Sequence, residues 1–116
     1  MLGASPNPER YSYLAIEMLQ QAGIPVLALG IKKGVVAGIP IQLDWNELSE
    51  GPIDTITLYV GAERQRPYYD RILGSKPRRI IFNPGAENPE LLRLAQLAGI
   101  ETLEACTLVM LRTRQY

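Results

Sequence analysis

Short apolar runs alternate along the chain with segments whose apolar residues recur at helical spacing. The runs are rich in Ile, Leu, Val and Thr and are bounded by glycine or proline, a pattern typical of buried strands. They predict strands over Met1–Gly3, Pro25–Leu29, Ile39–Gln42, Ile53–Val60, Arg79–Phe82 and Thr102–Ala105.

The segments between these runs predict helices. The first has an apolar stripe of Leu14, Ala15, Met18, Leu19 and Ala22; the second spans Glu63–Ser75, with Tyr68, Tyr69, Ile72 and Leu73 as its buried side. A third is marked by Leu91, Leu94, Ala95 and Ala98, a short one covers Leu108–Leu111, and Asp44–Leu48 predicts one helical turn. Gly23 and Gly99, each within an Ala-Gly-Ile triplet, predict the ends of two helices.

This alternation indicates βαβ units and a parallel sheet. We predict an α/β fold: a three-layer α/β/α Rossmann-like sandwich with a mostly parallel sheet of five or six strands. A chain of 116 residues, 47% of them apolar, suits a single domain over residues 1–116. Only Met1 and Leu2 precede the first glycine, so the first strand is either very short or completed by residues before Met1.

Charge and composition narrow the function. Lys and Arg together number 12, as do Asp and Glu, so the formal net charge is zero. Neutrality argues against nucleic acid and against an anionic membrane surface as partners. No apolar run is long enough to span a membrane, no signal peptide is evident, and a lone cysteine fits a cytoplasmic location.

The chain contains no histidine. This excludes Ser-His-Asp and Cys-His nucleophile pairs, histidine metal ligands and a phosphohistidine. Carboxylate-based metal or acid/base chemistry stays open, but the three aspartates, Asp44, Asp54 and Asp70, form no recognisable motif. We therefore expect no metal site and no catalytic activity.

Ligands of open parallel sheets bind beyond the carboxyl ends of the strands. Four loops are predicted to meet there: residues 3–12, 30–33, 61–63 and 83–88. In the first, Gly3 permits a tight turn, while Ala4 and Ser5 let a phosphate approach the backbone. Arg10 and Ser12 could add a charge and a hydroxyl; the alternative is an ordinary turn with Asn7 or Ser12 as N-cap.

The loop after the second strand differs from an NAD site. The G-x-G-x-x-G pattern is absent from the first loop, and Gly30, Lys32 and Lys33 stand where such sites carry a carboxylate. Cations here favour a ligand with an additional phosphate on its ribose, which means NADP or coenzyme A. The alternative is a solvated lysine pair.

Two further segments could serve a ligand or only the fold. Asn83-Pro84-Gly85 is a turn that could expose backbone amides, followed by Asn88 as N-cap and Pro89 as the first helical residue. Cys106 is predicted to be buried filler, with a reactive thiol at a helix N-terminus as the alternative.

Taken together and in order, residues 2–12, 54–60, 80–88 and 104–111 resemble the small stand-alone CoA-binding proteins. These are relatives of the nucleotide-binding domain of the succinyl-CoA synthetase α subunit. Two features depart from that family: Asn-Pro is missing after the second strand, and proline is missing near Gly61.

The resemblance implies a pocket for coenzyme A or an acyl-CoA. Gly3, Ala4 and Ser5 would hold phosphate with Arg10 and Ser12 nearby, and residues 30–33 would lie near the adenosine. The ligand would also be bordered by Val60, Gly61, Ala62, Asn83, Pro84 and Gly85. The synthetase reaction needs a histidine that this chain lacks, so we expect binding without turnover. The alternatives are an NADP-binding redox or sensor protein and a ligand-free interaction subunit; a protein partner or a homo-oligomer stays open.

Overall fold

The computed structural model describes residues 1–49 and 51–116. These residues form two compact units, the first made of residues 1–49 and 107–116 and the second of residues 51–106. Each unit is described by itself, and the single domain expected over residues 1–116 stays a prediction.

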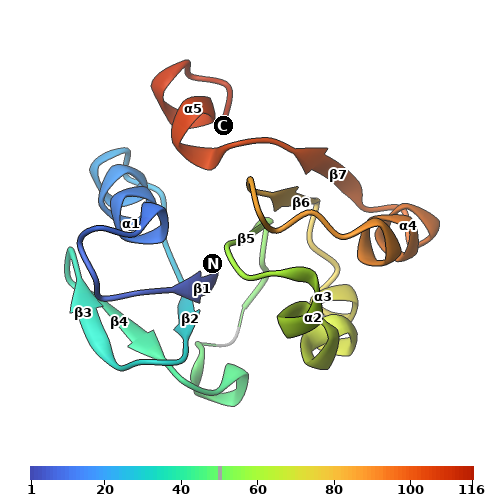
Figure 1. Ribbon diagram of the computed structural model, residues 1–116, viewed down its shortest axis with the longest axis horizontal. Coiled ribbons are helices and arrows are strands. Elements are labelled where there is room, and N and C mark those ends of the chain that lie inside the picture. The colour runs from blue at the N-terminus through green and yellow to red at the C-terminus, as the bar shows by residue number, and fades with distance from the viewer. Residues whose placement is uncertain (50) are drawn as a thin grey trace. The chain divides into compact units, whose positions relative to one another are not determined.

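The first unit combines four short strands with two helices and a 3-10 turn (Figure 1). Its elements are β1 (Leu2–Ala4), α1 (Tyr11–Gln21), β2 (Ala28–Gly30), β3 (Gly34–Val36), β4 (Ile39–Gln42), η1 (Trp45–Glu47) and α5 (Thr107–Arg112). The strands lie in the order β3-β4-β2-β1. The β1–β2 and β2–β4 pairs are parallel and β3–β4 is antiparallel.

The core of the first unit forms where α1 packs on these strands. It joins Ile16 of α1 to one buried side chain from each strand, namely Ala4, Ala28, Val36 and Ile41. The helical stripe expected from the sequence is confirmed in part: Ala15 and Leu19 are buried, whereas Leu14 is exposed.

Strand β3 was not predicted from the sequence, which indicated only a loop between Gly30 and Gly38. A two-residue turn at Ala37 and Gly38, with φ of 50° and 80°, folds β3 back onto β4. Positive φ at both central residues defines the hairpin turn that best matches the twist of paired strands. Ala37 hides this turn from sequence inspection, because asparagine or glycine usually occupies that position.

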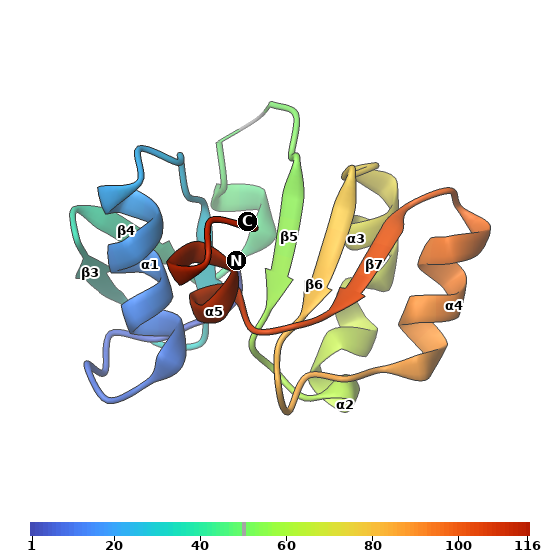
Figure 2. The same cartoon turned by 90° about the horizontal axis from the view of Figure 1, so that it is seen from above.

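The second unit has three parallel strands in the order β5-β6-β7 (Figure 2). Its elements are β5 (Thr55–Leu58), α2 (Ala62–Gln65), η2 (Arg66–Tyr68), α3 (Tyr69–Gly74), β6 (Arg79–Phe82), α4 (Pro89–Leu97) and β7 (Glu101–Glu104). Figure 1 shows α2, α3 and α4 on one side of these strands. All four residues of β6 are buried, as expected for a central strand.

The helix predicted over Glu63–Ser75 is divided into α2, η2 and α3. Pro67 lies at the start of η2, where its ring and missing N–H interrupt a regular helix. Of the predicted buried side, Ile72 is fully buried, while Tyr68, Tyr69 and Leu73 are half-buried.

Both glycine helix stops are confirmed. The amides of Gly23 and Ile24 donate to the carbonyls of Gln20 and Leu19, each at 3.0 Å. The corresponding amides of Gly99 and Ile100 donate to Gln96 and Ala95 at 3.0 and 2.9 Å. With φ of 74° and 78° at the two glycines, both helices end in the same Schellman motif.

The predicted α/β fold class with mostly parallel strands is confirmed. The described residues form seven strands, one more than the six runs indicated, because β3 adds an antiparallel edge. Among the helices of residues 1–49 and 51–116, none is long and apolar enough to cross a membrane.

Candidate ligand-binding site

The segment after β1 begins at a distorted strand. Leu2 pairs with Leu29 and Ala4 with Gly30, so two steps along β1 oppose one step along β2. Gly3, with φ of 99°, is the extra residue of this bulge. Glycine is needed here because a side chain at this φ is strained.

The loop that follows is shaped by hydrogen bonds among its own residues. The Asn7 amide donates to Ser5 Oγ at 3.1 Å, and the Glu9 amide donates to Asn7 Oδ1 at 3.0 Å. Neither Asn7 nor Ser12 caps the helix, so both N-cap assignments made from the sequence are wrong: the N-cap is Arg10. Asn7 lies too far upstream, because its carboxamide serves a turn that ends before the helix begins.

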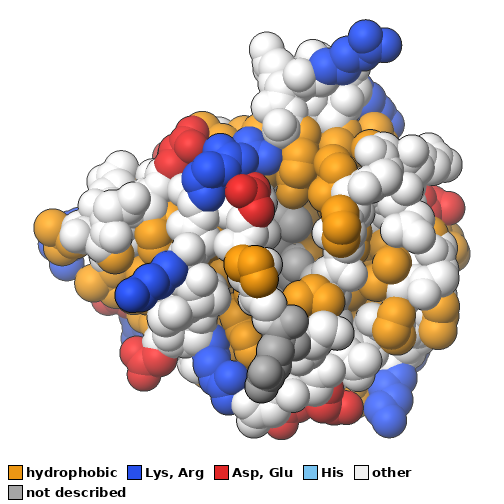
Figure 3. All heavy atoms as spheres, turned by 180° about the vertical axis from the view of Figure 1, so that it is seen from behind, with side chains coloured by type: hydrophobic (Ala, Val, Ile, Leu, Met, Phe, Trp, Pro, Cys, Tyr) orange, Lys and Arg blue, Asp and Glu red, His pale blue; other side chains and the backbone are white. Residues whose placement is uncertain are grey.

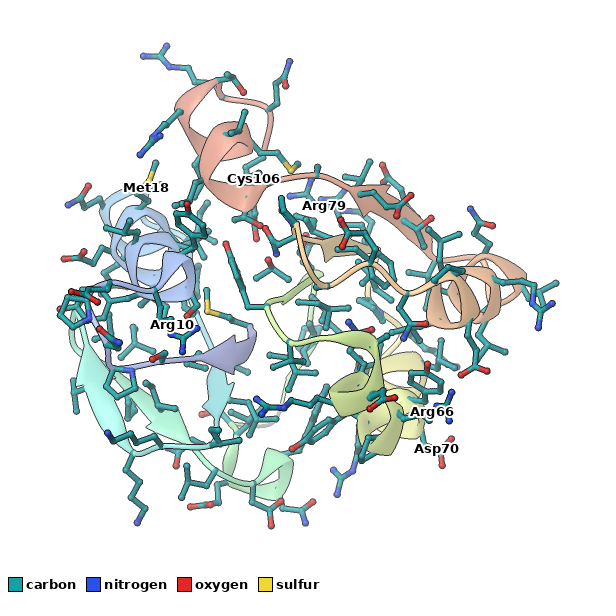
Figure 4. The ribbon with its side chains drawn as sticks, viewed as in Figure 1. Arg10, Met18, Arg66, Asp70, Arg79 and Cys106 are labelled. Carbon is teal, nitrogen blue, oxygen red and sulfur yellow. The ribbon has the colours of Figure 1, made fainter. Side chains whose placement is uncertain are left out.

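The N-terminus of α1 is left without a side-chain cap. Within the described part of the chain, the amides of Tyr11 and Ser12 have no acceptor. Ser12 is 3% exposed as a residue, and its hydroxyl, which makes no hydrogen bond there, keeps contact with solvent. Arg10 is exposed at the start of the helix (Figure 4). These groups and the helix dipole together suit an anion.

The loop after β2 lies against the loop after β1. A Cβ at Gly30 would meet the carbonyl oxygen of Ala4, and one at Gly34 would lie 2.6 Å from Cβ of Pro6. Packing within the unit therefore explains Gly30, which the sequence had suggested as a ligand contact. Lys32 and Lys33 are exposed and have no ion-pair partner among residues 1–49 and 51–116.

In the second unit, the residues after β5 start helix α2. Gly61 is its N-cap and Ala62 its first residue, and no side chain caps this end. A Cβ at Gly61 would meet no atom within 4 Å, so packing in the protein does not require glycine there. The Val60 carbonyl accepts a hydrogen bond from Gln65 Nε2 at 2.9 Å.

The loop after β6 is a closed turn. The Ala86 amide donates to the Asn83 carbonyl at 2.8 Å, with Pro84 and Gly85 between them and φ of 91° at Gly85. The Gly85 amide donates to Glu87 Oε1 at 2.8 Å, so it does not offer the exposed amide that the sequence suggested.

The side chain of Asn83 is also engaged, and it is only 1% exposed. Its Nδ2 donates to Thr57 Oγ1 at 2.7 Å and to the Leu58 carbonyl at 2.9 Å. Both amide hydrogens thus hold β6 to β5 rather than facing a ligand.

Helix α4 begins where the sequence predicted. Its N-cap residue also belongs to a hydrogen-bond network that was not predicted from the sequence. Asn88 Oδ1 accepts from the Leu91 amide at 3.1 Å, with Pro89 as the first helical residue. Asn88 Nδ2 donates to Gln65 Oε1 at 2.9 Å and to the Tyr69 hydroxyl at 2.8 Å. Gln65 was missed because its position in the sequence resembles an ordinary exposed helical site.

The described charged side chains form few close ion pairs. Arg78 donates to both carboxylate oxygens of Asp54 at 2.9 and 3.1 Å, and these bonds lower the pKa of Asp54 to about 2. Acidic and basic side chains are interspersed on the face shown in Figure 3. Cys106 is half-buried, and no cluster of potential metal ligands occurs in the described ranges.

Comparison with known proteins gives a consistent assignment. A family model described as "CoA binding domain" matches residues 1–112. A solved structure described as an uncharacterized protein is 43% identical, with a TM-score of 0.86 over 99% of this chain and 93% of its own.

Two more distant structures share the fold. A hypothetical protein from Pyrococcus horikoshii is 22% identical, with a TM-score of 0.85 over 98% of this chain and 80% of its own. A protein from Thermus thermophilus is 21% identical, with a TM-score of 0.84 over 99% of this chain and 87% of its own. No curated protein matches the chain significantly.

Proposed function

Because the chain belongs to the CoA binding domain family, we propose that it binds coenzyme A or an acyl-CoA and does not itself transform it. The family match supports a CoA ligand and gives no support to NADP, the alternative considered from the sequence.

The observation that carries this proposal is the uncapped start of α1. Its first amides have no acceptor in the described chain, and the Ser12 hydroxyl makes no hydrogen bond there and keeps contact with solvent. The amides and the hydroxyl are therefore available as donors, and a phosphate would supply acceptors for both. Ser5 accepts a hydrogen bond within the loop and keeps its own O–H as a donor.

The lysines after β2 support the choice of coenzyme A. Lys32 and Lys33 are exposed cations directly before β3, whose first residue, Gly34, lies against Pro6 of the β1–α1 loop. In this proposal they bind the 3′-phosphate of the adenosine, and charge-assisted contacts of this kind contribute about 1.5–3 kcal/mol.

Composition supports binding without turnover. The chain has no histidine, so neither a serine nor its single cysteine, Cys106, can form a nucleophile pair with one.

Isothermal titration calorimetry with CoA, acetyl-CoA, dephospho-CoA, NADP and NAD tests the proposal. We expect CoA and acetyl-CoA to bind and dephospho-CoA to bind about tenfold more weakly. Preference for NADP over CoA, or no binding of any of the five, would overturn it. Release of free CoA from acetyl-CoA, measured with a thiol reagent, would contradict the proposed absence of turnover and leave the proposed CoA binding standing.

A further inference from the structure

We infer that Gln65 positions two loops of the second unit: its carboxamide locks the loop after β5 to the loop after β6. The inference rests on the proposed CoA binding and on the expectation from the family resemblance that Val60–Ala62 and Asn83–Gly85 border the ligand.

The geometry is that of a buried cross-link. Gln65 is 0% exposed although it lies on a short helix beside a loop. Its Nε2 donates to the Val60 carbonyl at 2.9 Å and to the Ala86 carbonyl at 2.8 Å. One side-chain amide therefore holds the backbone of both loops, although Gln65 and Ala86 lie 21 positions apart in the sequence.

The rest of the carboxamide is satisfied as well. Gln65 Oε1 accepts from Asn88, whose second amide hydrogen goes to Tyr69, and the Tyr69 hydroxyl donates to Glu90 Oε1 at 2.9 Å. Every polar atom of Gln65 thus has a partner, so the side chain has one preferred position. Arg66 Nε lies 3.6 Å from Glu90 Oε1, and Figure 4 shows Arg66 near Asp70.

A role confined to packing would not require this residue type. Methionine has a similar length and would fill the space, whereas only a side-chain amide donates twice and accepts at the same point. The two loops carry small residues and backbone groups as their proposed contacts, so their relative position determines the fit of the ligand. Loops held before binding cost less to order when the ligand arrives.

The experiment compares Gln65→Met with a matched control, Ile72→Ala, which removes a fully buried side chain from α3 of the same unit. CoA affinity is measured by calorimetry well below each melting temperature. We expect Gln65→Met to weaken CoA binding by about tenfold, since three buried polar groups lose their partner. Ile72→Ala should lower the melting temperature and leave the affinity unchanged. Equal affinity for wild type and Gln65→Met would overturn the inference and leave the proposed function standing.

Hydrogen exchange of the ligand-free protein tests the same coupling without a ligand. The Arg64 amide bonds the Gly61 carbonyl at 3.0 Å, and the Ala86 amide bonds Asn83 at 2.8 Å, so each reports on one loop. In wild type we expect both amides to exchange through one opening event with the same free energy. Different opening free energies in wild type would overturn the inference, even if Gln65→Met does not fold. Failure of wild type to bind CoA would instead overturn the proposed function.

Discussion

The loop between β1 and α1 and the loop between β6 and α4 follow parallel strands and contain the same residue types. Each has an asparagine directly before a proline, Asn7-Pro8 in the first and Asn88-Pro89 in the second. Asn88 accepts the amide of Leu91 and caps its helix, whereas Asn7 accepts the amide of Glu9 inside the loop. Helix α1 therefore starts without a side-chain cap, whereas α4 starts with one.

This difference separates a helix start whose donors are open to a ligand from one whose polar groups the fold already satisfies. In the β6–α4 loop, the side chains of Asn83 and Asn88 bond residues outside the loop, and the Gly85 amide bonds Glu87 within it. In the β1–α1 loop, the first helical amides and the Ser12 hydroxyl have no partner in residues 1–49 and 51–116. Similar sequence motifs can thus serve a ligand or the fold. Which of the two applies depends on whether the protein already supplies hydrogen-bond partners for their polar groups.

The largest effect is expected at Gly3. Gly3→Val places a β-branched side chain at a φ of 99° and at the backbone that the phosphate must approach. We predict loss of measurable CoA binding in calorimetry, together with lower stability.

Gly23→Val is the matched control for Gly3→Val. Gly23 also has a positive φ, 74°, and a Cβ there would meet no atom within 4 Å. It should lower the melting temperature and retain CoA affinity. Retained binding in Gly3→Val would place the phosphate elsewhere.

Asn88→Ala should cause the largest loss of stability among the polar substitutions. It removes the cap of α4 and leaves Gln65 Oε1 without its donor, which costs about 3 kcal/mol of unfolding free energy. Denaturant unfolding measures this loss. Asn7→Ala, the same change in the β1–α1 loop, should cost less than about 1 kcal/mol because Asn7 is exposed. Equal losses at the two positions would remove the distinction between the loops.

Ser12→Ala tests a residue that is expected to affect ligand affinity and not stability. We expect CoA to bind about tenfold more weakly, because one hydrogen bond to a charged phosphate is lost. The unfolding free energy should stay about the same, since the hydroxyl makes no hydrogen bond to the described residues and keeps contact with solvent.

The same substitution in the second unit provides the control for Ser12→Ala. The Ser75 hydroxyl donates to the Ile72 carbonyl at 2.8 Å, so Ser75→Ala should reduce stability and leave CoA affinity intact. A Ser12→Ala protein that is less stable but binds CoA normally would assign Ser12 to the fold.

The smallest effect concerns the ion pair of the second unit. Arg78 lowers the pKa of Asp54 to about 2, below the value of about 3.9 expected in an unfolded chain. The pair therefore stabilises the folded state above about pH 4 and loses this contribution as the pH falls through 2. The stability difference between wild type and Asp54→Asn should shrink over this interval in acid denaturation. It should be small, because both side chains are largely exposed. A constant difference down to pH 2 would contradict the prediction.

Local patterns in the sequence determined several elements and some of their ends. Alternating apolar runs predicted β4 and β6 with their observed bounds, the glycines at 23 and 99 predicted two helix ends, and Asn88-Pro89 predicted the start of α4. These features depend on hydrogen bonds and side-chain spacing within a few residues, which a single segment of sequence contains.

Tertiary structure alone decided which candidate residues serve the fold. Gly30 is explained by the carbonyl oxygen of Ala4, Asn83 by Thr57 and Leu58, and the burial of Gln65 by Ala86 and Asn88. Each of these contacts joins residues more than 20 positions apart, so no local pattern encodes it. Whether a polar group remains available to a ligand depends on such distant partners, because every buried donor or acceptor must find one.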